Sequence, residues 1–297
     1  ISLTLMFLLM FGVFKKKSSS LVYNLTILSL FFLLALVLNL SHIEEAFIFN
    51  QSYKIDNLSN FMKILTLISA IFVMLTSSKY LKLTKIFKIE YPVLILSSLL
   101  GMIVMISSND LIVFYMGLEL QSLALYVLAS FNRDNLLSTE SGLKYFVLSA
   151  LSSGLLLYGC SLIYGFSGST NFNEIAISIS NVQYGLTFGI VFILVGLAFK
   201  ISAVPFHMWA PDVYQGSPTS VTIFFAILPK IAALTVFIRF LYVPFISMID
   251  QWQMIIIFLS IASMIFGAIA AIGQKNLKRL VAYSSISHMG YALAGLT

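Results

Sequence analysis

Three ionisable side chains lie deep inside apolar stretches of the sequence: Glu119, Lys200 and Lys230. A charged group at the centre of a membrane helix costs about 2.5–3.5 kcal/mol on insertion scales, so such groups are rare and usually mark ion or proton paths. Burial lowers the proton affinity of a lysine, and a nearby carboxylate raises it again. These residues are therefore candidate groups for proton translocation. The alternative is a buried ion pair that only fixes helix packing, and the sequence does not determine whether Glu119 contacts Lys200.

Two further residues are candidates for a supporting relay. His207 follows Lys200 by seven residues, which on a regular helix places it on the same face, about 10 Å further along. Histidine titrates near physiological pH and can pass a proton on. Lys144 is a second relay candidate, although a lysine near a helix end can also extend to water. Extension to water is the interpretation we favour for Lys63 and Arg239.

Prolines stand close to both buried lysines. Pro205 cannot donate a hydrogen bond to the carbonyl of Ile201, and Pro229 cannot donate to that of Phe225. Discontinuous helices place ion sites near the membrane midplane in many transporters, where protein or water satisfies the freed backbone groups. The sequence therefore predicts helix breaks at Pro205 and Pro229.

The elements that hold these groups must be membrane helices. Of 297 residues, 60% are apolar and 9% charged, and the mean hydropathy is +1.00. This composition excludes a soluble or a disordered chain. The single cysteine, Cys160, excludes a disulfide framework and a cysteine-based zinc or iron–sulfur site. The basic runs lack interleaved aromatic residues, so no nucleic-acid partner is expected.

Ten stretches are long and apolar enough, or nearly so, to cross the membrane as helices. They cover residues 1–14, 21–40, 58–78, 91–108, 111–131, 143–166, 185–209, 218–243, 252–273 and 279–297. The first begins at Ile1 without an initiator methionine, and the last is still apolar at Thr297. We therefore expect a single all-α membrane domain over residues 1–297, truncated at both ends and without a signal peptide.

The basic residues divide unevenly between the two sides of these segments. The positive-inside rule places the richer side in the cytoplasm or the mitochondrial matrix. Of the 17 Lys and Arg, that side holds Lys15, Lys16, Lys17, Lys79, Lys82, Lys85, Lys88, Arg133, Lys144, Lys275, Lys278 and Arg279. The other side holds only Lys54, Lys63 and Arg239. A longer loop at residues 41–57 carries His42, Glu44, Glu45 and Asp56, which we expect to form a solvated face.

Small and polar residues mark two of the segments. Ser149, Ser152, Ser153, Gly154 and Gly159 lie in the sixth, and Gly189 and Gly196 lie in the seventh, which predicts tight helix packing. The last segment has a polar face that either lines a second water path or makes ordinary interhelical hydrogen bonds. Its members are Tyr283, Ser284, Ser285, Ser287 and His288.

Four stretches resemble the antiporter-like subunits of respiratory complex I, and among these most closely subunit N (subunit 2 in mitochondria). Two are Gly117-Leu-Glu-Leu-Gln-Ser-Leu-Ala-Leu-Tyr-Val-Leu and Gly142-Leu-Lys-Tyr-Phe-Val-Leu-Ser-Ala-Leu-Ser-Ser-Gly. The others are Phe199-Lys-Ile-Ser-Ala-Val-Pro-Phe-His-Met-Trp-Ala-Pro-Asp-Val-Tyr-Gln-Gly-Ser-Pro and Lys278-Arg-Leu-Val-Ala-Tyr-Ser-Ser-Ile-Ser-His-Met-Gly-Tyr. The resemblance runs from about residue 90 to the end of the chain.

The resemblance implies a multi-pass bundle of the complex I/Mrp antiporter type, with fourteen helices in two inverted five-helix repeats. This chain would supply about ten of them, with the core of the first repeat at residues 110–243. Glu119 matches the family's glutamate on helix five, Lys200 the lysine on broken helix seven, and Lys230 the lysine on helix eight. Lys144 matches the lysine on helix six, and His207 matches the histidine after the break.

The resemblance further implies a proton-translocating subunit of NADH:quinone oxidoreductase, a translocase in which other subunits pass electrons from NADH to quinone. No cofactor or metal is expected on this chain; NADH, FMN, iron–sulfur clusters and quinone belong to the complex. The expected partners are the other complex I subunits, especially neighbouring antiporter-like and small membrane subunits, together with the lipid bilayer. The expected location is the bacterial inner (plasma) membrane or, alternatively, the mitochondrial inner membrane.

Two other functions stay open. A subunit of a multi-subunit sodium/proton antiporter would be similar in sequence and would move ions without redox chemistry. A purely structural membrane scaffold would tolerate apolar residues in place of the buried charges, since a buried ion pair is often no more stable than its hydrophobic replacement.

Overall fold

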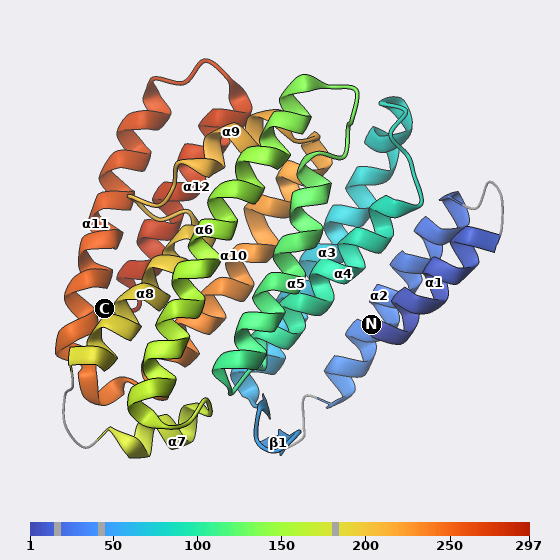
Figure 1. Ribbon diagram of the computed structural model, residues 1–297. Helices are drawn as coiled ribbons and strands as arrows, with labels where there is room; N and C mark the ends of the chain where they lie inside the picture. The colour runs from blue at the N-terminus through green and yellow to red at the C-terminus, as the bar shows by residue number, and fades with distance from the viewer. Residues whose placement is uncertain (15–18, 41–44, 180–183) are drawn as a thin grey trace.

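The computed structural model describes residues 1–14, 19–40, 45–179 and 184–297. Within these ranges it contains twelve α-helices, one short 3-10 helix and one two-stranded hairpin. The long helices lie side by side in a single bundle, with α1 and α2 at one edge and α11 and α12 near the other (Figure 1). The predicted all-α membrane bundle is confirmed.

Each of the ten predicted segments contains a helix. The bounds are α1 Ser2–Phe14, α2 Ser19–Leu40, α3 Asn57–Leu83, α4 Glu90–Ile106, α5 Leu111–Ala129, α6 Leu136–Ser167, α7 Phe172–Ser178, α8 Tyr184–Ile201, α9 Trp209–Gly216, α10 Thr219–Tyr242, η1 Ile246–Met248, α11 Ile249–Ile272 and α12 Leu277–Ala294. The hairpin pairs β1 (Ala46–Ile48) with β2 (Tyr53–Ile55) in antiparallel register. Within the described residues, seven helices are long and apolar enough to cross a membrane: α2, α3, α5, α6, α8, α10 and α11 together with η1.

Polar side chains at the helix N-termini explain where several helices begin. Asp56 accepts a hydrogen bond from the backbone N–H of Ser59 at the start of α3, and Asp110 caps α5 in the same way. Asn135 caps α6, so this helix begins seven residues before the apolar segment that the hydropathy marks. Each cap satisfies a backbone donor that has no partner within its helix.

The loops that carry most of the basic residues meet at one end of the bundle, here called the basic end. Lys278 donates to the carbonyl of Ser217 at 2.7 Å, which joins α12 to the α9–α10 connection. A small pocket at this end is also lined by Tyr80 and Asn135, from the ends of α3 and the α5–α6 connection. The predicted grouping of these loops agrees with this arrangement. Lys15, Lys16, Lys17, His42 and Glu44 lie outside the described residues.

Glycines bring the helices that carry the buried charges into close contact. A Cβ atom added at Gly101 on α4 would lie 2.5 Å from the backbone nitrogen of Gln121 on α5. One added at Gly159 on α6 would lie 2.8 Å from the carbonyl oxygen of Gly189 on α8. The predicted tight packing through small residues is therefore confirmed for the α6–α8 pair. Helices α4 and α5 also approach closely at a glycine.

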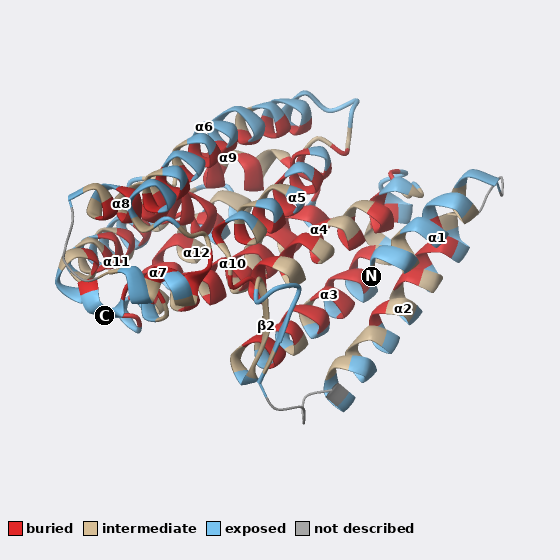
Figure 2. Cartoon of the chain, turned by 60° about the horizontal axis from the view of Figure 1, so that its bottom comes forward, coloured by how far each residue is buried: buried red, intermediate tan, exposed pale blue. Residues whose placement is uncertain are grey.

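The outer faces of the bundle are apolar. Large side chains such as Leu151, Phe258 and Ile269 are exposed, by 66%, 63% and 67%. Figure 2 shows exposed residues on the outward side of α6, whereas the central helix α10 is mostly buried. A continuous apolar exterior of this kind suits lipid rather than water.

Candidate functional site

The helix break predicted at Pro205 is present. Helix α8 ends at Ile201, one residue after Lys200, and α9 begins only at Trp209. Ser202 adopts a left-handed conformation with φ 60°, and Val204 donates its backbone N–H to Ser263 Oγ on α11 at 2.9 Å. Protein groups therefore satisfy the interrupted backbone, as expected for non-helical chain at membrane depth.

The break predicted at Pro229 is wrong. Helix α10 runs from Thr219 to Tyr242 without interruption and contains Pro229 within it. Proline removes one backbone hydrogen bond, but Leu228, Pro229 and Lys230 are all buried among neighbouring helices. Packing on several sides holds the helix together where one bond is missing.

Hydroxyl groups hold the Lys200 ammonium. The residue is 6% exposed, and its Nζ donates to Ser122 Oγ on α5 at 2.8 Å and to Ser149 Oγ on α6 at 2.6 Å. Tyr126 donates its hydroxyl to the same Ser149 oxygen at 2.6 Å. Both serines are themselves buried, so the lysine sits in a small polar site within an apolar core.

Glu119 lies beside this site without pairing with the lysine. It stands three residues before Ser122, so the two side chains share one face of α5. Among the described residues, no ion pair joins Glu119 to Lys200, and Glu119 Oε1 is buried without a protein hydrogen-bond partner. The carboxyl group is thus close enough in the fold to act on the lysine site, but a direct contact needs movement.

Lys230 occupies a second polar site. It is 4% exposed and donates to Ser285 Oγ on α12. Its Nζ also lies 5.8 Å from the ring centroid of Tyr214 on α9, a distance at which the ring stabilises the positive charge. Ser285 belongs to the polar face predicted on the last segment, and here it makes a hydrogen bond between helices.

Aromatic rings connect the surroundings of the two lysines. Tyr145 packs edge-on against Tyr126 at 5.0 Å and stacks on Trp209 at 4.6 Å between ring centroids. Trp209 in turn lies 6.4 Å from Tyr214. Among the described residues, the protein hydrogen bonds do not join one lysine site to the other. A proton that passes between them therefore needs water or a change in the position of these rings.

His207 does not share a helical face with Lys200. It lies in the segment between α8 and α9, because α8 has already ended at Ile201. Its ring centroid is 4.6 Å from that of Phe266 on α11. The predicted register between His207 and Lys200 assumed a regular helix and is therefore wrong.

Lys144 lies in an ion cluster at the basic end. Its Nζ is 2.8 Å from Asp212 Oδ2 on α9 and 2.7 Å from Glu140 Oε1 one turn earlier on α6. Arg279 on α12 reaches the other oxygen of Asp212 at 2.5 Å. The lysine side chain is 41% exposed, so it does extend toward water as one interpretation predicted. Among the described residues it contacts neither buried lysine, but its cluster joins α6, α9 and α12.

A buried ion pair lies at the opposite end of the bundle. Arg239 is 4% exposed and contacts Asp56 Oδ1 at 2.7 Å, while Lys63 is 6% exposed and faces the ring of Tyr53 at 5.1 Å. The prediction that Arg239 and Lys63 extend to water is wrong, because partners inside the protein hold them. Asp56 is not part of a solvated face either, whereas Glu45, which pairs with Lys54 at 3.2 Å, is 65% exposed.

The pKa of Asp56 reflects this pairing. Burial raises it, but the Arg239 guanidinium, the hydrogen bonds from Ser59 and the nearby Lys54 outweigh burial and hold the pKa below its ordinary value. Asp56 is therefore ionised at neutral pH and neutralises the buried guanidinium.

Three site residues were not predicted from the sequence. Ser122 and Tyr126 follow Glu119 by three and seven residues, so helical spacing from Glu119 would have indicated them. Tyr214 had no such signal, because its place beside Lys230 depends on how α9 turns after the break.

The part of the chain that forms the two lysine sites matches a known protein family. Residues 108–297 match the family described as NADH:quinone oxidoreductase/Mrp antiporter, transmembrane region. The chain belongs to this family. Its match spans α5 to α12 and includes all the residues that contact Lys200 and Lys230.

Relatives within this family are close in sequence. NADH-quinone oxidoreductase subunit N of Pelagibacter ubique is 74% identical over 297 residues, which are 100% of this chain and 63% of that protein. The protein of the same name from Parvibaculum lavamentivorans is 54% identical over 293 residues, 98% of this chain and 61% of its own length. The chain thus spans less than two thirds of the length of these relatives.

Solved structures of the family share the fold. A chain of respiratory complex I from Thermus thermophilus with bound aureothin has a TM-score of 0.84 and 31% identity, over 98% of this chain and 61% of that one. A chain of the Mrp complex from Dietzia has a TM-score of 0.87 over 100% of this chain and 57% of that one. Its 20% identity supports the fold alone.

Proposed function

We propose that this chain is part of a proton-translocating membrane subunit of an NADH:quinone oxidoreductase. The names of its relatives support membership of this complex. The buried lysine site supports a role in proton transfer. In this proposal the NADH, FMN, iron–sulfur and quinone chemistry takes place in other subunits, and the chain itself binds no cofactor. Its partners are those subunits, especially the neighbouring antiporter-like and small membrane subunits, and its location is a bacterial inner membrane.

The observation that carries the proposal is a buried lysine held by neutral hydroxyls. A serine hydroxyl can accept a hydrogen bond from an ammonium or donate one to a neutral amine. Ser149 can therefore satisfy Lys200 in both protonation states, whereas Ser122, which donates its own hydroxyl to the carbonyl of Leu118 at 2.7 Å, accepts from the ammonium. A carboxylate in their place would accept only, and would favour the charged form at all times.

Glu119 supplies the control in this mechanism. When its carboxylate approaches Lys200, the positive form of the lysine is stabilised; when the carboxylate recedes, burial favours release of the proton. Lys230 receives the proton next, once water or ring movement bridges the aromatic groups between the two sites. Lys144 and His207 are supporting groups in the proposal, and residues 110–243 form the core of the first repeat.

A native gel tests which assembly the chain belongs to. Membranes are extracted in mild detergent, and the gel is stained for NADH oxidation and probed for the full-length protein. We expect the protein to migrate with a large NADH-oxidising band that pumps protons after reconstitution. Migration in a smaller assembly without that activity, together with sodium-dependent proton flux, would show a stand-alone antiporter instead.

A further inference from the structure

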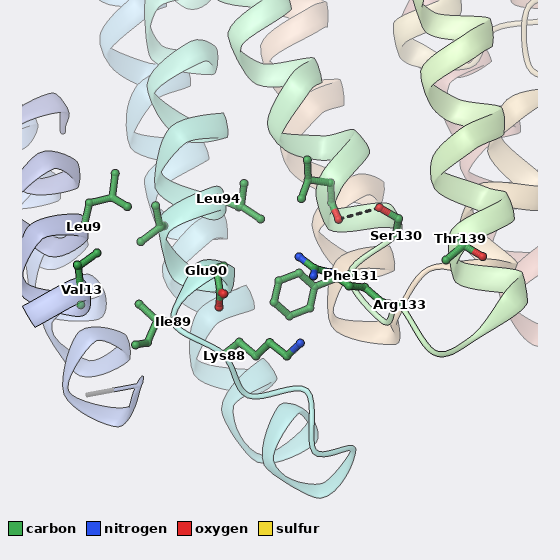
Figure 3. A pocket seen from close by; sticks show the side chains of 13 residues that line it. Leu9, Val13, Lys88, Ile89, Glu90, Leu94, Ser130, Phe131, Arg133 and Thr139 are labelled. Carbon is green, nitrogen blue, oxygen red and sulfur yellow. Dashed lines mark hydrogen bonds between the residues drawn. The ribbon is translucent and has the colours of Figure 1, made fainter. Parts of the chain in front are cut away.

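A cleft of about 630 Å³ lies between α1, α4 and α5 (Figure 3), and its lining includes no residue that contacts Lys200 or Lys230. Its volume falls within the range of about 300–1,000 Å³ usual for ligand sites. The walls are mainly apolar and come from Leu9 and Val13 on α1, Leu94 on α4, and Val127 and Phe131 at the end of α5. An apolar cleft on a lipid-facing surface accommodates a hydrocarbon chain.

One wall of the cleft is a close contact between α1 and the start of α4. At its inner wall, α1 already approaches the start of α4 closely, because a Cβ added at Gly12 would lie 2.8 Å from Ile89 Cγ2. Toward the outside the walls stay open, with Val13 76% and Val127 50% exposed. The cleft is therefore bounded by a close helix contact on one side and lined by exposed apolar side chains on the other.

The rim of the cleft at the basic end is charged. Lys88 and Arg133 line it and are both exposed, and among the described residues neither takes part in a hydrogen bond, ion pair or ring contact. Glu90 stands on the same rim, and the hydroxyls of Ser130 and Thr139 lie beside it (Figure 3). Both hydroxyls donate to backbone carbonyls of their own helices, so the rim binds through charge, and two cations against one carboxylate leave it net positive.

We propose that this cleft binds an anionic phospholipid. Its acyl chain lies along the apolar walls of α1, α4 and α5, and its phosphate group contacts Lys88 and Arg133. Basic residues at a membrane surface attract anionic headgroups by about 1 kcal/mol each, and guanidinium groups bind phosphate oxygens in pairs. The combination of an apolar cleft and two unpaired cations at one end matches the apolar chains and the negative phosphate of one lipid molecule.

Lipid titration of the full-length subunit in its complex tests this site. The delipidated complex receives phosphatidylglycerol or phosphatidylcholine, and native mass spectrometry counts the bound molecules at each concentration. The test variants are Lys88→Gln with Arg133→Gln, and separately Val127→Trp, which fills the cleft from an exposed position. Lys79→Gln with Lys275→Gln is the matched control, because both lysines are exposed at the basic end and line no part of the cleft.

The double rim variant is expected to bind one phosphatidylglycerol about 30-fold more weakly, which corresponds to about 1 kcal/mol for each charge. Its binding of phosphatidylcholine is expected to stay unchanged, and Val127→Trp is expected to lose one molecule of either lipid. Wild-type binding of phosphatidylglycerol in both variants would overturn the proposal. So would a crosslink from a photoreactive residue at position 9 to a neighbouring subunit in place of lipid.

Discussion

At the residue scale, the buried charges fall into two kinds with different partners. Lys200 and Lys230 have neutral partners, namely serine hydroxyls and a tyrosine ring. Arg239 has a carboxylate partner, Asp56, at 2.7 Å. A pair of opposite charges fixes the protonation state of both members, whereas neutral partners leave a lysine free to change it. Lysines with neutral partners are therefore suited to proton transfer, whereas the Asp56–Arg239 pair is suited to stabilising the fold.

The Asp56–Arg239 pair gives a pH-dependent prediction. Because the folded-state pKa of Asp56 is lowered, its stabilisation is complete above the ordinary value of about 3.9 and is lost as the pH falls through the folded-state pKa. Asp56→Asn should lower the free energy of unfolding at pH 7 by about 3 kcal/mol, since it leaves the guanidinium buried without a counter-charge. The difference from the wild type should shrink toward zero in acid.

Thermal unfolding of the purified full-length subunit at pH 7 and in acid well below the ordinary pKa of an aspartate measures this effect. Glu45→Gln serves as the control, because Glu45 pairs with Lys54 on an exposed surface and should change stability by less than about 1 kcal/mol. An Asp56→Asn variant as stable as the control at pH 7 would contradict the structural role of the pair.

At the scale of elements, close helix contacts set where Glu119 and Ser122 stand. Gly101→Ala should destabilise the protein by about 1–3 kcal/mol, because the added Cβ meets the backbone of α5 at 2.5 Å rather than a flexible side chain. Gly154→Ala is the matched control on α6. It meets nothing within 4 Å, so it should be neutral or stabilise by up to about 1 kcal/mol.

Unfolding temperatures of the two alanine variants in the same detergent check this prediction. Equal temperatures for Gly101→Ala and Gly154→Ala would show that α4 and α5 can separate without loss. In that case the close α4–α5 contact would not be what positions the lysine site.

Helix positions and the break near Pro205 could be predicted from the sequence, because hydropathy and proline act locally along the chain. The continuity of α10 through Pro229 could not, since it depends on neighbouring helices that bury the residue. The partners of Arg239 and Lys200 could not be predicted from the sequence either. Asp56 lies 183 residues from Arg239 in the sequence, and Ser122 lies 78 residues from Lys200. Only the packed bundle brings such residues together.

At the scale of the whole molecule, the bundle has an apolar exterior, a basic end and several polar sites inside. From the basic end inward lie the Lys144–Asp212–Arg279 cluster and the two buried lysines with their hydroxyl partners. A scaffold that only held partners together would not need buried lysines whose hydrogen-bond partners are neutral hydroxyls, because apolar residues in their place are at least as stable. The arrangement therefore favours charge movement through the bundle.

The most direct test measures proton movement per NADH oxidised in sealed vesicles that contain the whole complex. The variants are Lys200→Ala and Glu119→Gln, with Lys275→Ala, an exposed lysine at the basic end, as the control. We expect NADH-driven proton uptake to fall by about 10²-fold in the first two, because a group that transfers the proton is missing, while the complex still assembles and the control pumps normally. Wild-type pumping by both Lys200→Ala and Glu119→Gln would contradict the account.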